Sequence, residues 1–256
     1  MVLVSLALAP AVMAVAALIE RRLGPSAAGW IAALPVAFAV SVVAVAVDTT
    51  PHAAAAMALS AARQVSAQVA FGVAFAWVLR RRGLPLGVGC GALVYVAVSL
   101  VVQHVPDALA LLVAVGALVA GPRLMPAGQP RRPELRHWMG TALTCVSAAV
   151  VVGVAVLGSR LAGPDVAGAI AAFPTMCATL TVVAATRDDA AAGVHTLGGL
   201  VRSLPCYFTF CLVVALVTPV MGLAAVGLGL FACLSAAAFT WRWVPLAPKV
   251  VAAGEG

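Results

Sequence analysis

The chain repeats part of itself, and a constant offset relates the two copies. The segment from Arg21 to Pro35 returns without a gap as Arg160 to Pro174, and both copies hold an arginine, a Gly-Pro turn, a glycine and a final proline at matching positions. The spacing from Arg21 to Arg160, hereafter the repeat offset, also pairs Arg63 with Arg202 in the next hydrophobic segment. Chance similarity between alanine-rich segments would not preserve turn-forming and charged residues, so the sequence predicts an internal duplication.

The apolar content of the chain predicts an integral membrane protein. Of 256 residues, 64% are hydrophobic and only 9% are charged, which is more apolar surface than one water-soluble core can bury. A membrane-spanning helix needs about 20 apolar residues, and we predict nine such helices in an all-α, polytopic fold surrounded by the lipid bilayer. They lie at 2–19, 27–47, 56–79, 84–102, 106–121, 139–158, 166–186, 196–217 and 220–240.

The distribution of basic residues supports an odd number of spans. With the N-terminus outside and the C-terminus cytoplasmic, nine spans place twelve of the 15 Lys and Arg on the inner side and only Arg160 on the outer side. An odd number of helices then separates equivalent segments, so two four-helix repeats, 1–105 and 139–243, are expected in opposite orientations. A connector helix and basic cytoplasmic loop, 106–138, would join them, and 244–256 would be a short tail.

Composition also bears on location and partners. A chain rich in Ala, Val, Gly and Arg favours a high-GC bacterial source, hence a multi-pass protein of the plasma membrane. The net charge of +7 lies in short loops beside the membrane, where it serves as a topology signal and contacts anionic lipid, so no nucleic-acid partner is predicted. All six cysteines fall within predicted spans, as expected of small buried side chains rather than disulfides.

Prolines and glycines recur at matching positions in the second helix of each repeat. Pro35 and Pro174 should kink these helices and leave backbone carbonyls without their usual partners, which in transporters often happens where a helix lines a cavity. A kink that serves only packing is the alternative. Gly29 and Gly168 belong to stripes of small residues that favour close helix contact in lipid.

Polar residues in the third helix of each repeat, with one in the seventh helix of the chain, are the candidate substrate ligands. Arg63 and Arg202 stand inside the predicted hydrocarbon region near opposite ends, where each could bind an anionic group from one side; snorkelling to lipid headgroups is the alternative. Three further candidates are Gln64, Gln68 and Tyr207. Thr175, directly after Pro174, is the last, and hydrogen bonding between or within helices would explain these side chains equally well.

No pattern of residues indicates an enzyme, a metal site or a cofactor. The sequence contains no HExxH, Gly-rich phosphate loop or GxSxG motif, and every Asp and Glu maps to a loop or to the tail. No catalytic residue, metal ligand or cofactor is therefore predicted, and a carboxylate proton relay inside the membrane is not expected.

The second repeat resembles the small four-helix bacterial inner-membrane proteins of the GlpM type. The shared features are Ala167-Gly168, Phe173-Pro174-Thr175 and Tyr207-Phe208. The resemblance implies a four-helix unit from a family linked to polysaccharide production, and it suggests a fusion of two such units with a ninth helix that inverts one of them. It implies no substrate.

These observations favour a small secondary transporter or exporter of an anionic or amphipathic small molecule that works by alternating access. The alternative is a membrane subunit that scaffolds an envelope or biosynthetic complex, in which the polar helix faces would contact a partner protein. A homo-oligomer is compatible with either interpretation.

Overall fold

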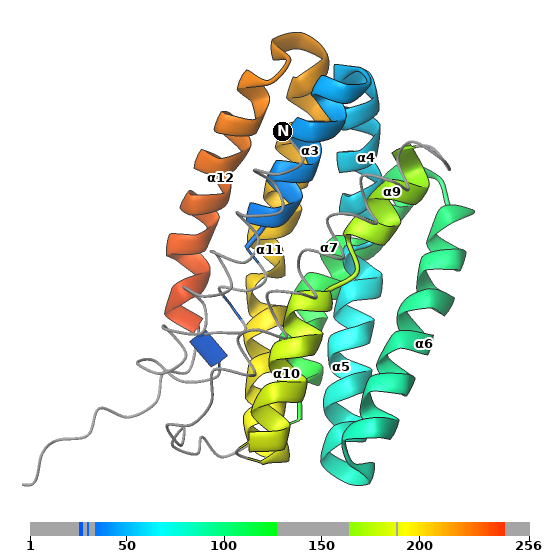
Figure 1. Ribbon diagram of the computed structural model, residues 1–256, viewed down its shortest axis with the longest axis vertical. Helices are drawn as coiled ribbons and strands as arrows, with labels where there is room; N and C mark the ends of the chain where they lie inside the picture. Colours follow the sequence, from blue (N-terminus) through cyan, green and yellow to red (C-terminus); the bar gives the residue numbers. More distant parts are fainter. Residues whose placement is uncertain (1–25, 28–29, 31–33, 127–163, 188, 244–256) are drawn as a thin grey trace, which may run out of the picture.

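The computed structural model describes residues 26–27, 30, 34–126, 164–187 and 189–243. Within these residues the chain is helical and contains no β-strand, which confirms the all-α prediction (Figure 1). Five helices are long and apolar enough to cross a membrane, as the sequence led us to expect of a membrane-embedded protein. The predicted spans 2–19 and 139–158 lie outside the described residues.

Each described helix falls on or next to one of the predicted hydrophobic segments. Helices α4 and α5 are interrupted only at Gln64 and together form one candidate span of 32 residues, and the predicted fifth span is an 18-residue helix. The elements are α3 (Val36–Asp48), α4 (Pro51–Arg63), α5 (Val65–Arg82), α6 (Leu84–Gln103), α7 (Asp107–Leu124), α9 (Pro164–Ala171), α10 (Thr175–Arg187), α11 (Ala190–Met221), α12 (Ala224–Thr240) and the 3-10 turn η1 (Trp241–Trp243).

Helix boundaries follow the repeat offset found in the sequence. When that offset is applied, both ends of α3 coincide with both ends of α10, the start of α4 coincides with the start of α11, and the end of α5 coincides with the end of α11. In Figure 1, α4 and α5 run from the top of the molecule to the bottom, whereas α11 runs from the bottom to the top. Helices α6 and α12 also run in opposite directions.

The residues that begin and end these helices match as well. The Thr50 side chain caps α4 by accepting a hydrogen bond from the Ala53 amide, and Asp189, at the equivalent position of the second half, caps α11 in the same way through the Ala192 amide. Gly83 and Gly222, which the repeat offset also pairs, follow α5 and α11 with φ angles of 87° and 57°. Glycine suits these two positions because side chains disfavour positive φ.

Small residues allow each half of the chain to pack against the other. Helix α9 crosses α4 so closely that a Cβ at Gly168 would lie 2.5 Å from the Met57 carbonyl oxygen. At the equivalent crossing, a Cβ at Gly199 of α11 would collide with the backbone of Ser26. The close contact expected of Gly168 is therefore present, while Gly29 lies outside the described residues.

Candidate functional site

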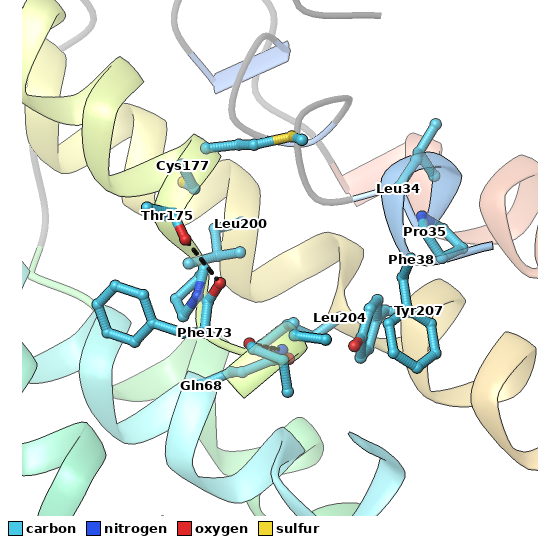
Figure 2. A pocket seen from close by; sticks show the side chains of 14 residues that line it. Leu34, Pro35, Phe38, Gln68, Phe173, Thr175, Cys177, Leu200, Leu204 and Tyr207 are labelled. Carbon is cyan, nitrogen blue, oxygen red and sulfur yellow. Dashed lines mark hydrogen bonds between the residues drawn. The ribbon is translucent and has the colours of Figure 1, made fainter. Parts of the chain in front are cut away.

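A cavity of about 80 Å³ lies where the two proline-containing segments meet. Figure 2 shows one wall formed by residues around Pro35, an opposite wall formed by residues around Pro174, and side chains from α5 and α11 between them. The lining residues are Leu34, Pro35, Phe38, Gln68, Ala171, Ala172, Phe173, Pro174, Thr175, Met176, Cys177, Leu200, Leu204 and Tyr207.

Pro174 separates α9 from α10 at this cavity. Because proline has no amide hydrogen, the regular helical bonds stop here, and the Phe173 amide bonds to the Ile170 carbonyl at 3.1 Å instead. Thr175 turns back on the break, since both its amide and its hydroxyl donate to the Phe173 carbonyl, at 2.8 and 3.1 Å. The predicted kink is thus a complete break of the helix.

Side chains from the first half of the chain satisfy carbonyls near this break. The Gln68 amide of α5 donates a hydrogen bond to the Ala172 carbonyl. The Tyr95 hydroxyl of α6 donates to the Ala169 carbonyl at 2.7 Å. Buried carbonyls without donors would be costly in the membrane interior, so these bonds hold α9 in place beside α5 and α6.

Helices α3 and α10 both begin at the cavity. The first regular helical bonds run from the Ala39 amide to the Pro35 carbonyl, at 2.7 Å, and from the Ala178 amide to the Pro174 carbonyl, at 2.9 Å. The amides before Ala39 and Ala178 therefore have no intrahelical partner of this kind. Neither helix has an acidic residue in its first turn.

Four pairs of cavity residues are related by the repeat offset. They are Leu34 and Phe173, Pro35 and Pro174, Phe38 and Cys177, and Gln68 and Tyr207. The prolines are the same in both halves, whereas the other pairs differ in chemistry. Equivalent positions of the two halves thus face one another across a single space.

Two polar groups in the cavity have no hydrogen-bond partner of ordinary geometry, although their side chains lie near each other. They are the hydroxyl of Tyr207 and the side-chain oxygen of Gln68, on residues that are 6% and 3% exposed. The Tyr207 ring packs against Phe38, with ring centroids 5.5 Å apart, and this contact points its hydroxyl toward the cavity (Figure 2). An unpartnered buried polar group is destabilising, and four further groups among the described residues share this condition: Trp30 Nε1, Arg63 Nε, His195 Nε2 and Thr218 Oγ1.

The structure places Arg63 away from the cavity and gives it several partners. Its guanidinium forms an ion pair with Asp107 at 2.9 Å and donates to the carbonyls of Val102, Gln103 and Val105, at 2.8, 3.3 and 3.1 Å. These carbonyls belong to the C-terminal end of α6 and the turn that follows, where a positive charge is favourable.

Arg202 has a different environment from Arg63. It is half-buried on α11, with a guanidinium nitrogen close to Gly198, and it makes no ion pair within the described part of the chain. Arg202 precedes Tyr207 by the same spacing that separates Arg63 from Gln68. Arg63 ends α4 and Arg202 stands at the equivalent position of α11, and α4–α5 and α11 run in opposite directions (Figure 1).

Of the residues singled out in the sequence, five line the cavity: Pro35, Pro174, Gln68, Tyr207 and Thr175. Gln64 does not, since its side-chain oxygen accepts a hydrogen bond from Ser99 of α6 at 2.7 Å, the interhelical bond that we considered as the alternative. The sequence analysis did not single out the apolar lining residues. Residues next to Pro35, together with the residues that the repeat offset pairs with them, would have been reasonable further candidates. They include Leu34 with Phe173 and Phe38 with Cys177.

Among the residues that the structure describes, no group of three or more His, Cys, Asp or Glu side chains could hold a metal ion. No protein-family model matches the chain, and neither a curated protein nor a solved structure is detectably similar to it.

Proposed function

We propose that the chain is a small secondary transporter that moves an anionic or amphipathic small molecule across a bacterial plasma membrane by alternating access. The observation that carries this proposal is the cavity between the breaks at Pro35 and Pro174. Broken helices that meet at mid-membrane are a recurrent way to build a solute site, because exposed backbone is tolerated there only next to a cavity.

Inverted repeats are part of the proposal. The nine spans would form two four-helix units in opposite orientations, with α7 as the connector, the N-terminus outside and the C-terminus in the cytoplasm. Matching helix ends, equivalent caps and the antiparallel courses of α4–α5 and α11 support this arrangement. The GlpM-like residues of the second half suggest that such a unit arose by duplication of a four-helix protein.

In an inverted repeat, transport follows when the two halves exchange conformations. The arginines differ in their contacts: Arg63 is held by Asp107 and by carbonyls of α6, whereas Arg202 makes no ion pair within the described residues. Because Arg63 is held by its partners in this structure, we assign the structure to a state that is closed at the end near Arg63. Release of Arg63 from these partners would accompany opening of that end.

Cysteine accessibility tests this proposal without knowledge of the substrate. In a cysteine-free background, Leu34→Cys and Phe173→Cys place single thiols at equivalent positions on opposite walls of the cavity. We expect membrane-impermeant thiol reagents to label both thiols, and to reach both faster from the side away from Arg63. A variant that retains only Cys206, which is buried outside the cavity lining, is the matched control and should stay unlabelled.

The contrary outcome is equally informative. If both cavity thiols stay unlabelled while an exposed cysteine introduced at Arg82 reacts, no aqueous path reaches the cavity and the transporter proposal fails. Co-purification of a partner protein in fixed ratio would then favour the scaffolding subunit.

A further inference from the structure

We propose that an anionic phospholipid binds with its headgroup near the C-terminal ends of α5 and α7, where Trp77, Arg81 and Arg123 form a basic site. Contact with anionic lipid was expected of every basic loop alike, and the structure distinguishes one defined site among them. The site is independent of transport. In the proposed topology it belongs to the cytoplasmic leaflet.

Trp77 joins the two helices at this site. Its indole Nε1 donates a hydrogen bond to the Leu124 carbonyl at the end of α7, over 2.8 Å. The guanidinium carbon of Arg81 lies 4.8 Å from the centre of the Trp77 ring, as in a cation–π contact. The side chain of Trp77 is 37% exposed, so lipid can reach an indole that is held in place. Such a tryptophan is typical of the interface between membrane and water.

Both arginines keep donors for a ligand. A guanidinium has five N–H groups. Arg123 uses one in a bond to the Val119 carbonyl of its own helix, at 2.6 Å, and Arg81 contacts an aromatic ring. Both residues are exposed, and neither makes an ion pair within the part of the chain that the structure describes. The oxygens of a phosphate match a guanidinium in geometry and in charge.

The second half of the chain shows that the helix end itself does not require basic residues. The repeat offset pairs Trp77 with Leu216 and Arg81 with Val220. Leu216 and Val220 are 72% and 86% exposed, and α11 is followed, like α5, by a glycine with positive φ. Equivalent helices therefore end in a similar way with basic or with aliphatic side chains, which leaves the charge at the end of α5 to serve a partner.

An aliphatic face beside the basic site favours a lipid as that partner. Leu112, Val115 and Val119 are exposed on one face of α7, and Arg123 continues this face by one turn. Acyl chains can lie along the aliphatic side chains while the phosphate reaches the two arginines. The arginines would repel the choline of a zwitterionic lipid, so an anionic headgroup is preferred.

Quenching of Trp77 by brominated lipid tests this site. The variant keeps Trp77 and has phenylalanine at the other four of the five tryptophans. It is reconstituted in phosphatidylcholine vesicles that contain a fixed fraction of either dibrominated phosphatidylglycerol or dibrominated phosphatidylcholine. We expect phosphatidylglycerol to quench more strongly. Arg81→Gln and Arg123→Gln should each lower its relative affinity about fivefold, as expected for one basic residue at an anionic membrane surface.

Two controls separate a defined site from diffuse attraction. Arg82→Gln removes the same charge from the same helix end, but the contact with the indole belongs to Arg81, so the affinity should fall by less than about twofold. Leu216→Trp, combined with Trp77→Phe, places the single tryptophan at the equivalent position of the second half, where both brominated lipids should quench equally.

Three results would overturn the site: equal quenching of Trp77 by the two brominated lipids, equal losses in Arg81→Gln and Arg82→Gln, or loss of the preference in inorganic phosphate but not in chloride of equal ionic strength. The last result would assign the arginines to a soluble anion. If the single-tryptophan variant does not fold, the Tm of the unmodified protein in detergent replaces it. Added phosphatidylglycerol should raise that Tm more than phosphatidylcholine does, and equal values would again overturn the site.

Discussion

The crossing of α9 over α4 should make Gly168→Ala destabilising although alanine is the better helix former. A Cβ at this position would lie 2.5 Å from the Met57 carbonyl oxygen and 2.6 Å from the Cβ of Ser60. Both atoms are fixed to the backbone of α4, so no side-chain rotation can relieve the clash. Ordinary contact begins near 3.4 Å, hence α9 must move away by nearly 1 Å.

The cost of that movement can be estimated. Overpacking of this kind destabilises by about 1 to 3 kcal/mol. The bond from Tyr95 to the Ala169 carbonyl, already 2.7 Å long, would lengthen as α9 shifts, and its loss costs about 1 kcal/mol. Replacement of a helical glycine returns up to about 1 kcal/mol. The expected net loss is about 2 kcal/mol, or roughly 4 to 8 °C in Tm for a chain of this size.

Thermal unfolding of these variants can be followed with the native cysteines. Cys177, Cys206, Cys211 and Cys233 are buried and free, so a thiol-reactive dye reports their exposure as the purified protein is heated in detergent. Gly116→Ala in α7 is the control, because a Cβ there would meet nothing within 4 Å, and its Tm should stay the same or rise.

A rescue variant sharpens this prediction. Ser60→Gly removes two of the three atoms that the new methyl group meets, the Cβ and Oγ of Ser60, and glycine is the residue found at the equivalent position 199. Ser60→Gly combined with Gly168→Ala should recover part of the lost Tm. If Gly168→Ala alone unfolds within a degree of the parent, the close helix crossing and the cavity geometry that depends on it are refuted.

Three further predictions use the same thermal assay. Arg63→Gln should lower the unfolding free energy by about 1 to 3 kcal/mol, because an ion pair and bonds to carbonyls are lost together; Arg82→Gln, at an exposed helix end, should change it by less than about 0.5 kcal/mol. Tyr95→Phe should cost about 1 to 3 kcal/mol, since the Ala169 carbonyl loses its donor; no change in Tm would contradict that bond. Gly222→Ala should cost about 1 to 2 kcal/mol because of its positive φ, and an unchanged Tm would contradict the turn geometry.

Local chemistry explains which features the sequence could predict. The lengths of apolar segments predicted the helices, and a missing amide hydrogen at proline predicted the interruption before α10, because both depend on residues near one another in the chain. Pro35, Pro174, Thr175, Gln68 and Tyr207 were selected in this way, and the structure gathers them around one cavity.

Contacts between distant segments could not be predicted in the same way. Arg63 was expected to serve a substrate or lipid headgroups, but its partner is Asp107, the first residue of α7, which the fold brings to the end of α4. The acceptor of Gln68 is the Ala172 carbonyl, which belongs to the other half of the chain. A single sequence shows that such side chains need partners, but the partners depend on how the helices pack.

Of the four equivalent pairs of residues in the cavity, only the prolines are the same in both halves of the chain. Each half has its own proline at the cavity, because a helix break is a property of the local backbone. The side chains share one small space. A glutamine at position 207 would add a second amide there but no hydroxyl, and the Ala172 carbonyl already has a donor in Gln68. Gln68 therefore supports the break between α9 and α10, whereas Tyr207 packs against Phe38, so divergence has given these two equivalent positions different contacts.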